Sequence, residues 1–498
     1  MVLSNYLNVL FYNKNALCYN RNTMRSKCMC TTYKCAKKSE ANGRKTQMEK
    51  KRSSFSGKIG FVLAAAGSAV GLGNLWRFPY LAAKYGGGIF LLVYIILAVT
   101  FGYALMTAEV AIGRKTGLSA IQSFKVLNKK YSFIGYLASL VPIIILPYYC
   151  VIGGWVIKYF SVFISGQTTA AAADGYFDSF ISQTGQPILW LVIFILITAV
   201  IVFLGVEKEI EKASKFLMPV LVVLSVIVAI YSITMPGAMA GVKYYLMPDF
   251  SKFSLKTVVA AMGQLFYSMS LAMGIMITYG SYMKKDVDLE KSVSNIEIFD
   301  TGIALIAGLM IVPAVFVFNG GDGAAINAGP GLMFVTLPKV FNSMPFGSVI
   351  GGLFFILVLF AALTSAISLM ETIVSILHDK LGWGRKVSCV IVTLYAIAMA
   401  LPSSLGFGAL SSVQPMGMSF LDFFDFISNS ILMPIVAFLT VCFVGYVIKP
   451  KAIADEIKLS SAFKKEKLFN VMIKYIAPIF IIMILVSSIL NALQIYTL

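Results

Sequence analysis

Eleven mostly apolar segments alternate with shorter polar stretches along this chain. They cover residues 59–82, 88–112, 133–165, 187–204, 213–234, 257–283, 293–318, 347–377, 387–401, 422–448 and 468–494. Several of them are long enough to cross a hydrocarbon core of ~30 Å as a helix. A transmembrane barrel would instead show weak alternation in strands of about ten residues. The pattern predicts an all-α integral membrane protein with eleven transmembrane helices.

Two of these spans are interrupted by glycine and polar residues. The first contains GSAVGLGNLWRFP at 67–79, and the sixth contains QLFYSMSLAMG at 264–274. Backbone groups freed at membrane depth cost several kcal/mol each, so they persist where protein buries them or where they bind something. We therefore expect helices 1 and 6 to be broken around a binding site.

The two interrupted spans each begin a run of five. Corresponding broken helices in two halves of a transporter indicate an inverted repeat with its site near the bilayer midplane. The sequence predicts a 5+5 arrangement within a transporter core at 51–448, with repeats at 59–234 and 257–448. Residues 449–498 would form a cytoplasmic linker and the eleventh helix. The Gly- and Pro-rich loop 319–345 is a candidate lid.

Composition and charge set the topology. Hydrophobic residues make up 58% of the 498 residues and charged residues only 13%, which excludes a soluble globule. The net charge of +19 comes from lysines and arginines in the N-terminal tail and in alternate loops such as 113–130 and 449–474. By the positive-inside rule, these segments face the cytoplasm of a cell membrane. The N-terminus would be cytoplasmic and the C-terminus outside, and the charge implies no nucleic-acid partner.

The basic segment 1–50 is expected to be a disordered cytoplasmic tail. It lacks the apolar core of a signal peptide, and Met48 is a candidate for the native start. Cys28, Cys30 and Cys35 do not match the spacing of a tetrahedral metal site, and no histidine lies near them. No disulfide framework is implied by the seven cysteines.

Five sequence features together resemble the neurotransmitter:sodium symporters, in particular their bacterial eleven-span amino acid transporters with a LeuT-type fold. The resemblance covers about residues 50–494. The features are the string at 67–79, Gly-Gly-Gly at 86–88, Tyr148-Tyr149 with Trp155, Gly263-Gln264-x-Phe266, and Leu363-Thr364-Ser365.

The resemblance implies two sodium sites. One sodium ion would be bound by the carbonyls of Gly67, Val70 and Ala361 and by the hydroxyls of Thr364 and Ser365. The spacing of three and four residues places the last three on one face of the eighth span. Sodium is a hard cation that prefers oxygen ligands, which a broken helix supplies. In an unrelated membrane helix, both hydroxyls would instead back-bond to their own helix.

The second sodium ion would take the carbonyl of Ala69, the amide oxygen of Asn74, Ser268, Asp300 and the carboxylate of the substrate. Asp300 stands where many family members have Asn, and Ala304 matches the chloride-coordinating Ser of chloride-dependent members. A carboxylate inside the membrane is costly unless it meets a cation. We therefore expect this fixed charge to replace chloride.

Three features favour an amino acid as the substrate. The half-helix after Gly73 points its positive N-terminus at the break, as suits a carboxylate. Tyr149 can donate its hydroxyl to the same carboxylate, and Gly71 stands where monoamine carriers have Asp. By resemblance, the substrate site comprises Ser68, Ala69, Leu72, Gly73, Ile145, Tyr149, Tyr267, Ser268, Ser270, Met273, Ser365 and Leu369. The apolar wall predicts a hydrophobic or aromatic L-amino acid.

Two charge pairs and two aromatic residues are predicted gates. Arg77 would pair with Asp425 on the outer side, and Arg52 with Asp379 on the inner side. Tyr149 and Tyr267 would close over the substrate. For each arginine the alternative is a side chain that snorkels to the interface.

Other ionisable residues receive structural expectations. Glu109 and Glu371 are expected to be satisfied structural carboxylates, and His378 a solvated helix-end residue. Glu209 stands ten residues before Pro219, where the family often has Gly, so the way in which the fifth span unwinds is an open question.

The sequence thus predicts a sodium-coupled amino acid symporter that works by alternating access, and it does not predict an enzyme. The runner-up is a proton-coupled or exchange carrier of the same fold, in which Asp300 would titrate. A third reading is a substrate sensor or channel that keeps the site without transport. The oligomeric state stays open.

Overall fold

The computed structural model describes residues 54–319 and 329–492. This part of the chain is helical and contains no β-strand, only an isolated bridge between Gly87 and Pro248. The predicted tail at 1–50, including Cys28, Cys30 and Cys35, and the predicted gate residue Arg52 lie outside the described residues, as does 320–328 of the predicted lid. The all-α prediction is confirmed.

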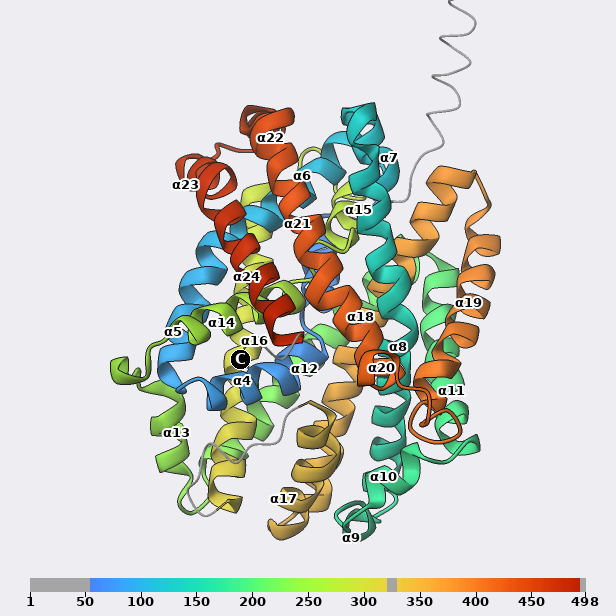
Figure 1. Ribbon diagram of the computed structural model, residues 1–498, viewed down its shortest axis with the longest axis vertical. Coiled ribbons are helices and arrows are strands. Elements are labelled where there is room, and N and C mark those ends of the chain that lie inside the picture. Colours follow the sequence, from blue (N-terminus) through green and yellow to red (C-terminus); the bar gives the residue numbers. More distant parts are fainter. Residues whose placement is uncertain (1–53, 320–328, 493–498) are drawn as a thin grey trace, which may run out of the picture. The chain divides into compact units, whose positions relative to one another are not determined.

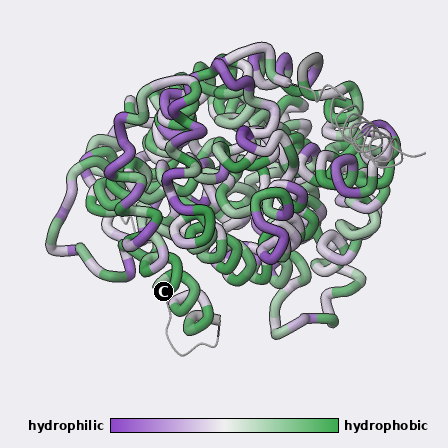
Figure 2. The backbone as a smooth tube through the Cα atoms, turned by 90° about the horizontal axis from the view of Figure 1, so that it is seen from above, coloured by the Kyte–Doolittle hydropathy of each residue, from purple (hydrophilic) through white to green (hydrophobic). Residues whose placement is uncertain are grey.

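Nine helices in the described residues are long and apolar enough to cross a membrane. They are α5 (Gly88–Leu97) continuing through η2 (Ala98–Gly102) into α6 (Tyr103–Thr116), α8 (Ser132–Ile164), α11 (Gly185–Leu204), α12 (Glu211–Ile233), α16 (Leu289–Phe318), α18 (Gly347–Leu381), α19 (Arg385–Leu405), α20 (Phe420–Asp425) with η8 (Phe426–Leu432), α21 (Met433–Cys442) and η9 (Phe443–Val447), and α23 (Glu466–Val471) with η10 (Met472–Ile476) and α24 (Ala477–Ala492). Figure 2 shows hydrophobic residues along the helices throughout this bundle.

The remaining two predicted spans are the broken ones. The first consists of α3 (Lys58–Ala69), then η1 (Gly73–Arg77) and α4 (Phe78–Lys84), with a bend of 53°. The sixth is divided into α14 (Leu255–Ser268) and α15 (Ile275–Ser281), so neither part is long enough to count as a span. Both interruptions occur where the glycine and polar residues predict them.

The first break lies slightly later than the first glycine of its string. Gly67 remains inside α3, and the chain leaves the helix at Val70, whose ψ is 93°. A Cβ at Gly67 would lie 3.2 Å from Cβ of Thr364 in α18. Gly67 is therefore needed because the two helices approach closely, and the unwinding belongs to residues 70–72.

The two broken spans lie inside the bundle (Figure 1). Helix α3 packs against α12, α16 and α18, and α15 packs against α6. Helix α8 packs along α18 and α11, whereas α11 and α19 pack together farther from the breaks. Every residue from Ala64 to Leu72 is buried, so protein encloses the first break. This burial is what allows non-helical backbone at membrane depth.

Short helices gather at the two ends of the bundle. At one end lie α7 (Ala120–Leu127), α22 (Pro450–Ile457) and α23, and at the other α9 (Thr168–Ala171), α10 (Tyr176–Ile181), α13 (Ala238–Leu246) and α17 (Leu337–Ser343) (Figure 1). The loops predicted to be cytoplasmic, 113–130 and 449–467, thus share one end. Within the predicted lid, Lys339 of α17 pairs with Asp174, which lowers the pKa of that carboxyl.

A short interruption precedes the fifth span. Gly205, with a φ of 110°, separates α11 from a short turn of π-helix, η4 (Val206–Ile210), which leads into α12. The backbone N–H of Glu209 donates to the Gly205 carbonyl at 3.2 Å. The interruption therefore falls at Gly205, and Glu209 itself is helical.

A buried ion pair fastens α22 to the end of α6. The Arg114 side chain is fully buried and its Nε donates to Oε1 of Glu456 at 3.0 Å. Lys285 also pairs with Glu456 at 2.7 Å, and Arg114 donates to the Val287 carbonyl at 2.8 Å. This cluster joins the linker before the last helix to the loop between α15 and α16.

We predict that Glu456→Gln lowers the stability of the detergent-solubilised protein, because it leaves the Arg114 charge buried without a counter-charge. The expected cost is about 3 kcal/mol or more. Glu466→Gln is the matched control, since the Lys458–Glu466 pair is partly exposed and is worth less than about 1 kcal/mol. Fluorescence-detected thermal unfolding measures both. Equal melting temperatures for the two variants would contradict the assignment.

Candidate functional site

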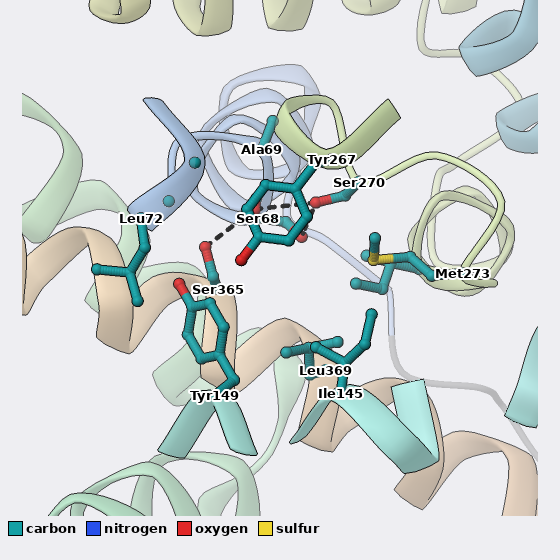
Figure 3. Close-up of a pocket in the computed structure, with 13 residues that line it drawn as sticks. Ser68, Ala69, Leu72, Ile145, Tyr149, Tyr267, Ser270, Met273, Ser365 and Leu369 are labelled. Atoms are coloured by element: carbon teal, nitrogen blue, oxygen red, sulfur yellow. Dashed lines mark hydrogen bonds between the residues drawn. The ribbon is translucent and has the colours of Figure 1, made fainter. Parts of the chain in front are cut away.

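A cavity lies where the two broken spans face α8 and α18 (Figure 3). It is lined by Ser68, Ala69, Gly71, Leu72, Gly73, Ile145, Tyr149, Tyr267, Ser270, Met273, Ile275, Ser365 and Leu369. Eleven of the twelve predicted substrate residues are in this set; Ser268 is the exception, and Gly71 and Ile275 are added. In Figure 3 the hydroxyls of the serines and of Tyr149 gather on one side, and Met273, Ile145 and Leu369 lie on the other. The cavity therefore has a polar end and an apolar end.

Two hydroxyl groups, one from the second break and one from α18, bond the backbone of the first break. Ser270 and Ser365 both donate to the Ser68 carbonyl at 3.0 Å, and the Ser68 and Ser270 hydroxyls are 3.1 Å apart. These bonds satisfy a carbonyl in the last turn of α3, where intrahelical donors are missing. The broken first span is thus tied to the second break and to α18.

Gly71 is required by the narrowness of the polar end. A Cβ at this position would lie 2.7 Å from Oγ of Ser365 and 3.2 Å from the Tyr149 hydroxyl. The Tyr149 hydroxyl is buried near Ser365 and the Leu72 backbone, but it forms no hydrogen bond of good geometry with a described residue. A buried donor without a partner costs about 1–3 kcal/mol, so this hydroxyl is suited to bind a ligand acceptor.

The second break is strained. Ser270 has a φ of 52° and Ala272 a φ of 61°, in the left-handed region that residues with a Cβ seldom adopt. The Glu109 carboxylate accepts from the Ala272 N–H at 2.8 Å and so stabilises this conformation. Strain of this kind clusters at binding and switch regions. Glu109 thus has the expected structural role through Oε1, but it is not the satisfied carboxylate that the sequence predicts, because its buried Oε2 has no hydrogen-bond partner among the described residues.

A buried carboxylate lies beside both breaks. Asp300 of α16 is fully buried and accepts from Nδ2 of Asn74 at 2.8 Å, from the Ser268 hydroxyl at 2.8 Å and from the Tyr94 hydroxyl at 3.3 Å. No lysine, arginine or histidine pairs with it in the described part of the chain. Three of the predicted ligands of the second sodium ion, Asn74, Ser268 and Asp300, therefore meet.

Tyr94 is the member of this cluster that the sequence did not single out. It lies in α5 and is fully buried, and it also donates to the Ser268 hydroxyl at 3.3 Å. One tyrosine inside an apolar stretch gives no signal of a site by itself. Packing of α5 against α14 brings its hydroxyl to Ser268, which itself donates to Asp300 of α16.

The predicted residues of the first sodium site also come together. Gly67 and Thr364 are in contact, and Ser365 reaches across to α3. The Thr364 hydroxyl donates within its own helix, to the carbonyls of Phe360 at 3.0 Å and Ala361 at 3.1 Å. The structure does not test whether these residues bind sodium, so the ligand set of Gly67, Val70, Ala361, Thr364 and Ser365 stays a prediction. Two of its members, Ala361 and Thr364, are hydrogen-bonded to each other.

The charge pair predicted for the outer gate, Arg77 with Asp425, is not in direct contact. Arg77 lies over the Tyr267 ring, with its guanidinium carbon 5.4 Å from the ring centroid. Asp425 accepts from the Tyr148 hydroxyl at 3.1 Å and from Nδ2 of Asn429 at 2.5 Å, and no ion pair joins it to Arg77 among the described residues. Tyr148, the neighbour of Tyr149, is thus the partner of Asp425 in this conformation.

Aromatic rings pack around Phe55, near the predicted inner gate. Phe55 is buried, and its ring lies 5.7 Å from Tyr279 and 6.0 Å from Tyr282 between centroids. Its N–H donates to the Tyr282 carbonyl at 3.1 Å. Asp379, the predicted inner gate carboxylate, accepts from the Ser119 N–H at 2.7 Å; its proposed partner Arg52 lies outside the described residues.

Two further carboxylates hold the inner side. Glu211 of α12 accepts from the Ser56 N–H at 2.8 Å and pairs with Lys215 at 2.6 Å. Glu371 accepts from the Tyr282 hydroxyl at 2.6 Å and from the Arg385 guanidinium. The prediction of a satisfied Glu371 agrees with this geometry, whereas the sequence did not single out Glu211.

Comparison with known proteins places these features in a family. The model of the sodium:neurotransmitter symporter family matches residues 52–177 and 176–497. An uncharacterized sodium-dependent transporter of Bacillus subtilis, YhdH, is 34% identical over 89% of this chain and 98% of its own length. A second one, from Haemophilus influenzae, is 33% identical over 89% of this chain and 99% of its own length.

A solved structure agrees with the same assignment. The crystal structure of MhsT in complex with L-phenylalanine has a TM-score of 0.79 and 38% sequence identity, over 88% of this chain and 100% of that chain. This likeness and the family match both extend over the broken helices and the cavity. The chain therefore belongs to the sodium:neurotransmitter symporter family, as a multi-pass membrane transporter with a LeuT-type fold that uses sodium.

Proposed function

We propose that this protein is a chloride-independent symporter that couples sodium to the uptake of hydrophobic or aromatic L-amino acids. The main support is the Asp300 cluster: a fully buried carboxylate at the break, bonded by Asn74, Ser268 and Tyr94 and lacking a basic side chain. A buried negative charge is costly unless a cation meets it. A sodium ion at this position supplies that charge, and chloride would only add a second negative charge.

The substrate is proposed from the two ends of the cavity. The unpartnered Tyr149 hydroxyl and the N-terminus of the half-helix after Gly73 suit a carboxylate. Ile145, Met273 and Leu369 form an apolar end that suits a hydrophobic side chain, with Met able to adapt to different shapes. The relative MhsT, whose structure contains L-phenylalanine, supports the same class.

Coupling follows from a shared site. If Ala69, Asn74, Ser268, Asp300 and the substrate carboxylate bind the same sodium ion, then each ligand raises the affinity of the other by the same factor. The first sodium ion, at the site between α3 and α18, would fix the broken helix against the eighth span. Arg77 with Tyr267 on the outer side, and Arg52, Phe55 and Asp379 on the inner side, are the proposed gates. We further propose that the two repeats move against each other, with the N-terminus in the cytoplasm.

We predict that Thr364→Ala raises the sodium concentration needed for half-maximal uptake at least tenfold, or about 1.4 kcal/mol, because one ion ligand is lost. Thr198→Ala is the control. Its buried hydroxyl also back-bonds, to the Phe194 carbonyl at 2.9 Å, but lies in α11 away from the breaks. Uptake into liposomes at graded sodium concentration measures both. The same sodium dependence in both variants would refute the first site.

The role of Asp300 predicts that the native protein works equally well when gluconate replaces chloride. Asp300→Asn should lower uptake at least tenfold, since the neutral amide no longer balances the sodium charge. Adding Ala304→Ser should then restore part of the activity with chloride present and none without it. Asp422→Asn, at an exposed carboxylate in α20, is the control. Strict chloride dependence of the native carrier would overturn this proposal.

Substrate class is tested by competition against labelled phenylalanine. Leucine, methionine, tyrosine and tryptophan should compete, whereas glycine, GABA, dopamine and serotonin should not. Gly71→Ala should abolish binding, because its methyl group would fill the space next to Ser365 and Tyr149. Gly352→Ala, where no atom lies within 4 Å of the added methyl group, should bind normally. If an amine without a carboxylate competes best, the proposed carboxylate subsite is wrong.

A further inference from the structure

A second cavity lies far from the breaks, in the groove between α11 and α19. Its volume is about 260 Å³, and all its lining residues are apolar except Thr393. Ala199 and Cys389 form the floor; both are buried, and the Cys389 thiol lies 3.6 Å from the Ala199 carbonyl. Leu196, Phe203 and Leu394 rise beside this floor and are each more than one third exposed. The small side chains of Ala199 and Cys389 allow α11 and α19 to pack closely, and the larger side chains line the two sides of the groove.

The groove offers no hydrogen-bonding group to a ligand along its length. The Thr393 hydroxyl already donates to the Cys389 carbonyl of its own helix at 2.8 Å. Because α11 and α19 are membrane-spanning helices, the exposed walls face the bilayer. An acyl chain therefore fits this surface, since it buries apolar area and needs no polar partner.

The position of the groove matches one leaflet. From Leu196 to Leu204, the last residue of α11, a helix rises about 12 Å, most of the ~15 Å hydrocarbon depth of a leaflet. At the same end, Trp383 precedes α19 and is 41% exposed, as is typical of the membrane interface. The groove thus extends from the interface toward the midplane.

The ammonium group of Lys386 lies at the end of the groove nearest the predicted membrane interface. Nζ of Lys386, in the first turn of α19, lies 5.5 Å from the centroid of the Phe203 ring that lines the groove. Lys386 is exposed and forms no ion pair within the described ranges, whereas the neighbouring Arg385 is engaged by Glu371. An anionic headgroup at this level would meet a free ammonium group.

We propose that this groove binds an anionic phospholipid, with one acyl chain between α11 and α19 and its phosphate group at Lys386. A zwitterionic lipid with the same chains would gain the apolar contacts but less of the charge attraction. One lysine near an anionic membrane surface is worth about 1 kcal/mol, which is about fivefold in affinity.

The test is native mass spectrometry of the full chain in detergent, titrated with phosphatidylglycerol or phosphatidylcholine of identical acyl chains and without amino acid substrate. The native protein should bind one phosphatidylglycerol molecule more tightly than it binds further molecules of the same lipid. Lys386→Gln should lower the preference for phosphatidylglycerol about fivefold. Lys380→Gln, at the same end but over the Tyr136 ring, should change it less than twofold.

A second pair of variants tests the groove itself. Thr393→Phe should weaken binding of both lipids at least tenfold, and Val387→Phe, on the same helix outside the groove, should leave it unchanged. Thr393→Leu is a smaller change and should weaken binding of both lipids by a lesser factor. Melting temperatures measured without lipid verify that each variant is folded. Equal effects of the two lysine variants, unchanged binding by Thr393→Phe, or a native dimer that this variant dissociates would each overturn the proposal.

Discussion

The structure depends on one constraint that acts at membrane depth. Backbone groups outside a helix must be hydrogen-bonded by protein, and a buried charge must be balanced by protein or by a bound ion. The first break is satisfied by Ser270 and Ser365, which donate to the Ser68 carbonyl, and the second by Glu109, which accepts from Ala272. Each bond joins elements that are distant in sequence. The two broken spans therefore depend on each other, and a ligand between them contacts both.

The buried charge of Asp300 is hydrogen-bonded but is not balanced by a basic side chain among the described residues. Three neutral donors surround the carboxylate, but hydrogen bonds do not cancel a buried negative charge. In the proposed function a sodium ion would balance this charge, and no mobile anion would be needed.

The cavity is covered on both sides by different interactions. On the outer side, Arg77 lies over Tyr267 while Asp425 is held by Tyr148, so a direct Arg77–Asp425 pair would require these contacts to change. On the inner side, Phe55 is enclosed by aromatic rings and Ser56 is bound by Glu211. Since α12 carries Glu211, these bonds join the segment before α3 to the fifth span.

The residue pattern determined the helical class and the two broken spans, because glycine, hydroxyl and acidic residues inside apolar segments are costly unless they are bonded or bind a ligand. Most of the cavity lining followed only from the resemblance of the motifs to a known family. The sequence could not locate Tyr94 or Glu211, since one polar residue in a helix carries no signal until packing supplies its partner, and it named Tyr148 without its bond to Asp425. Nor could it separate two uses of glycine: Gly67 serves close packing against Thr364, and the unwinding follows at 70–72. Which groups meet across helices was decided only by the tertiary structure, because those contacts depend on distances between segments that are far apart in the chain.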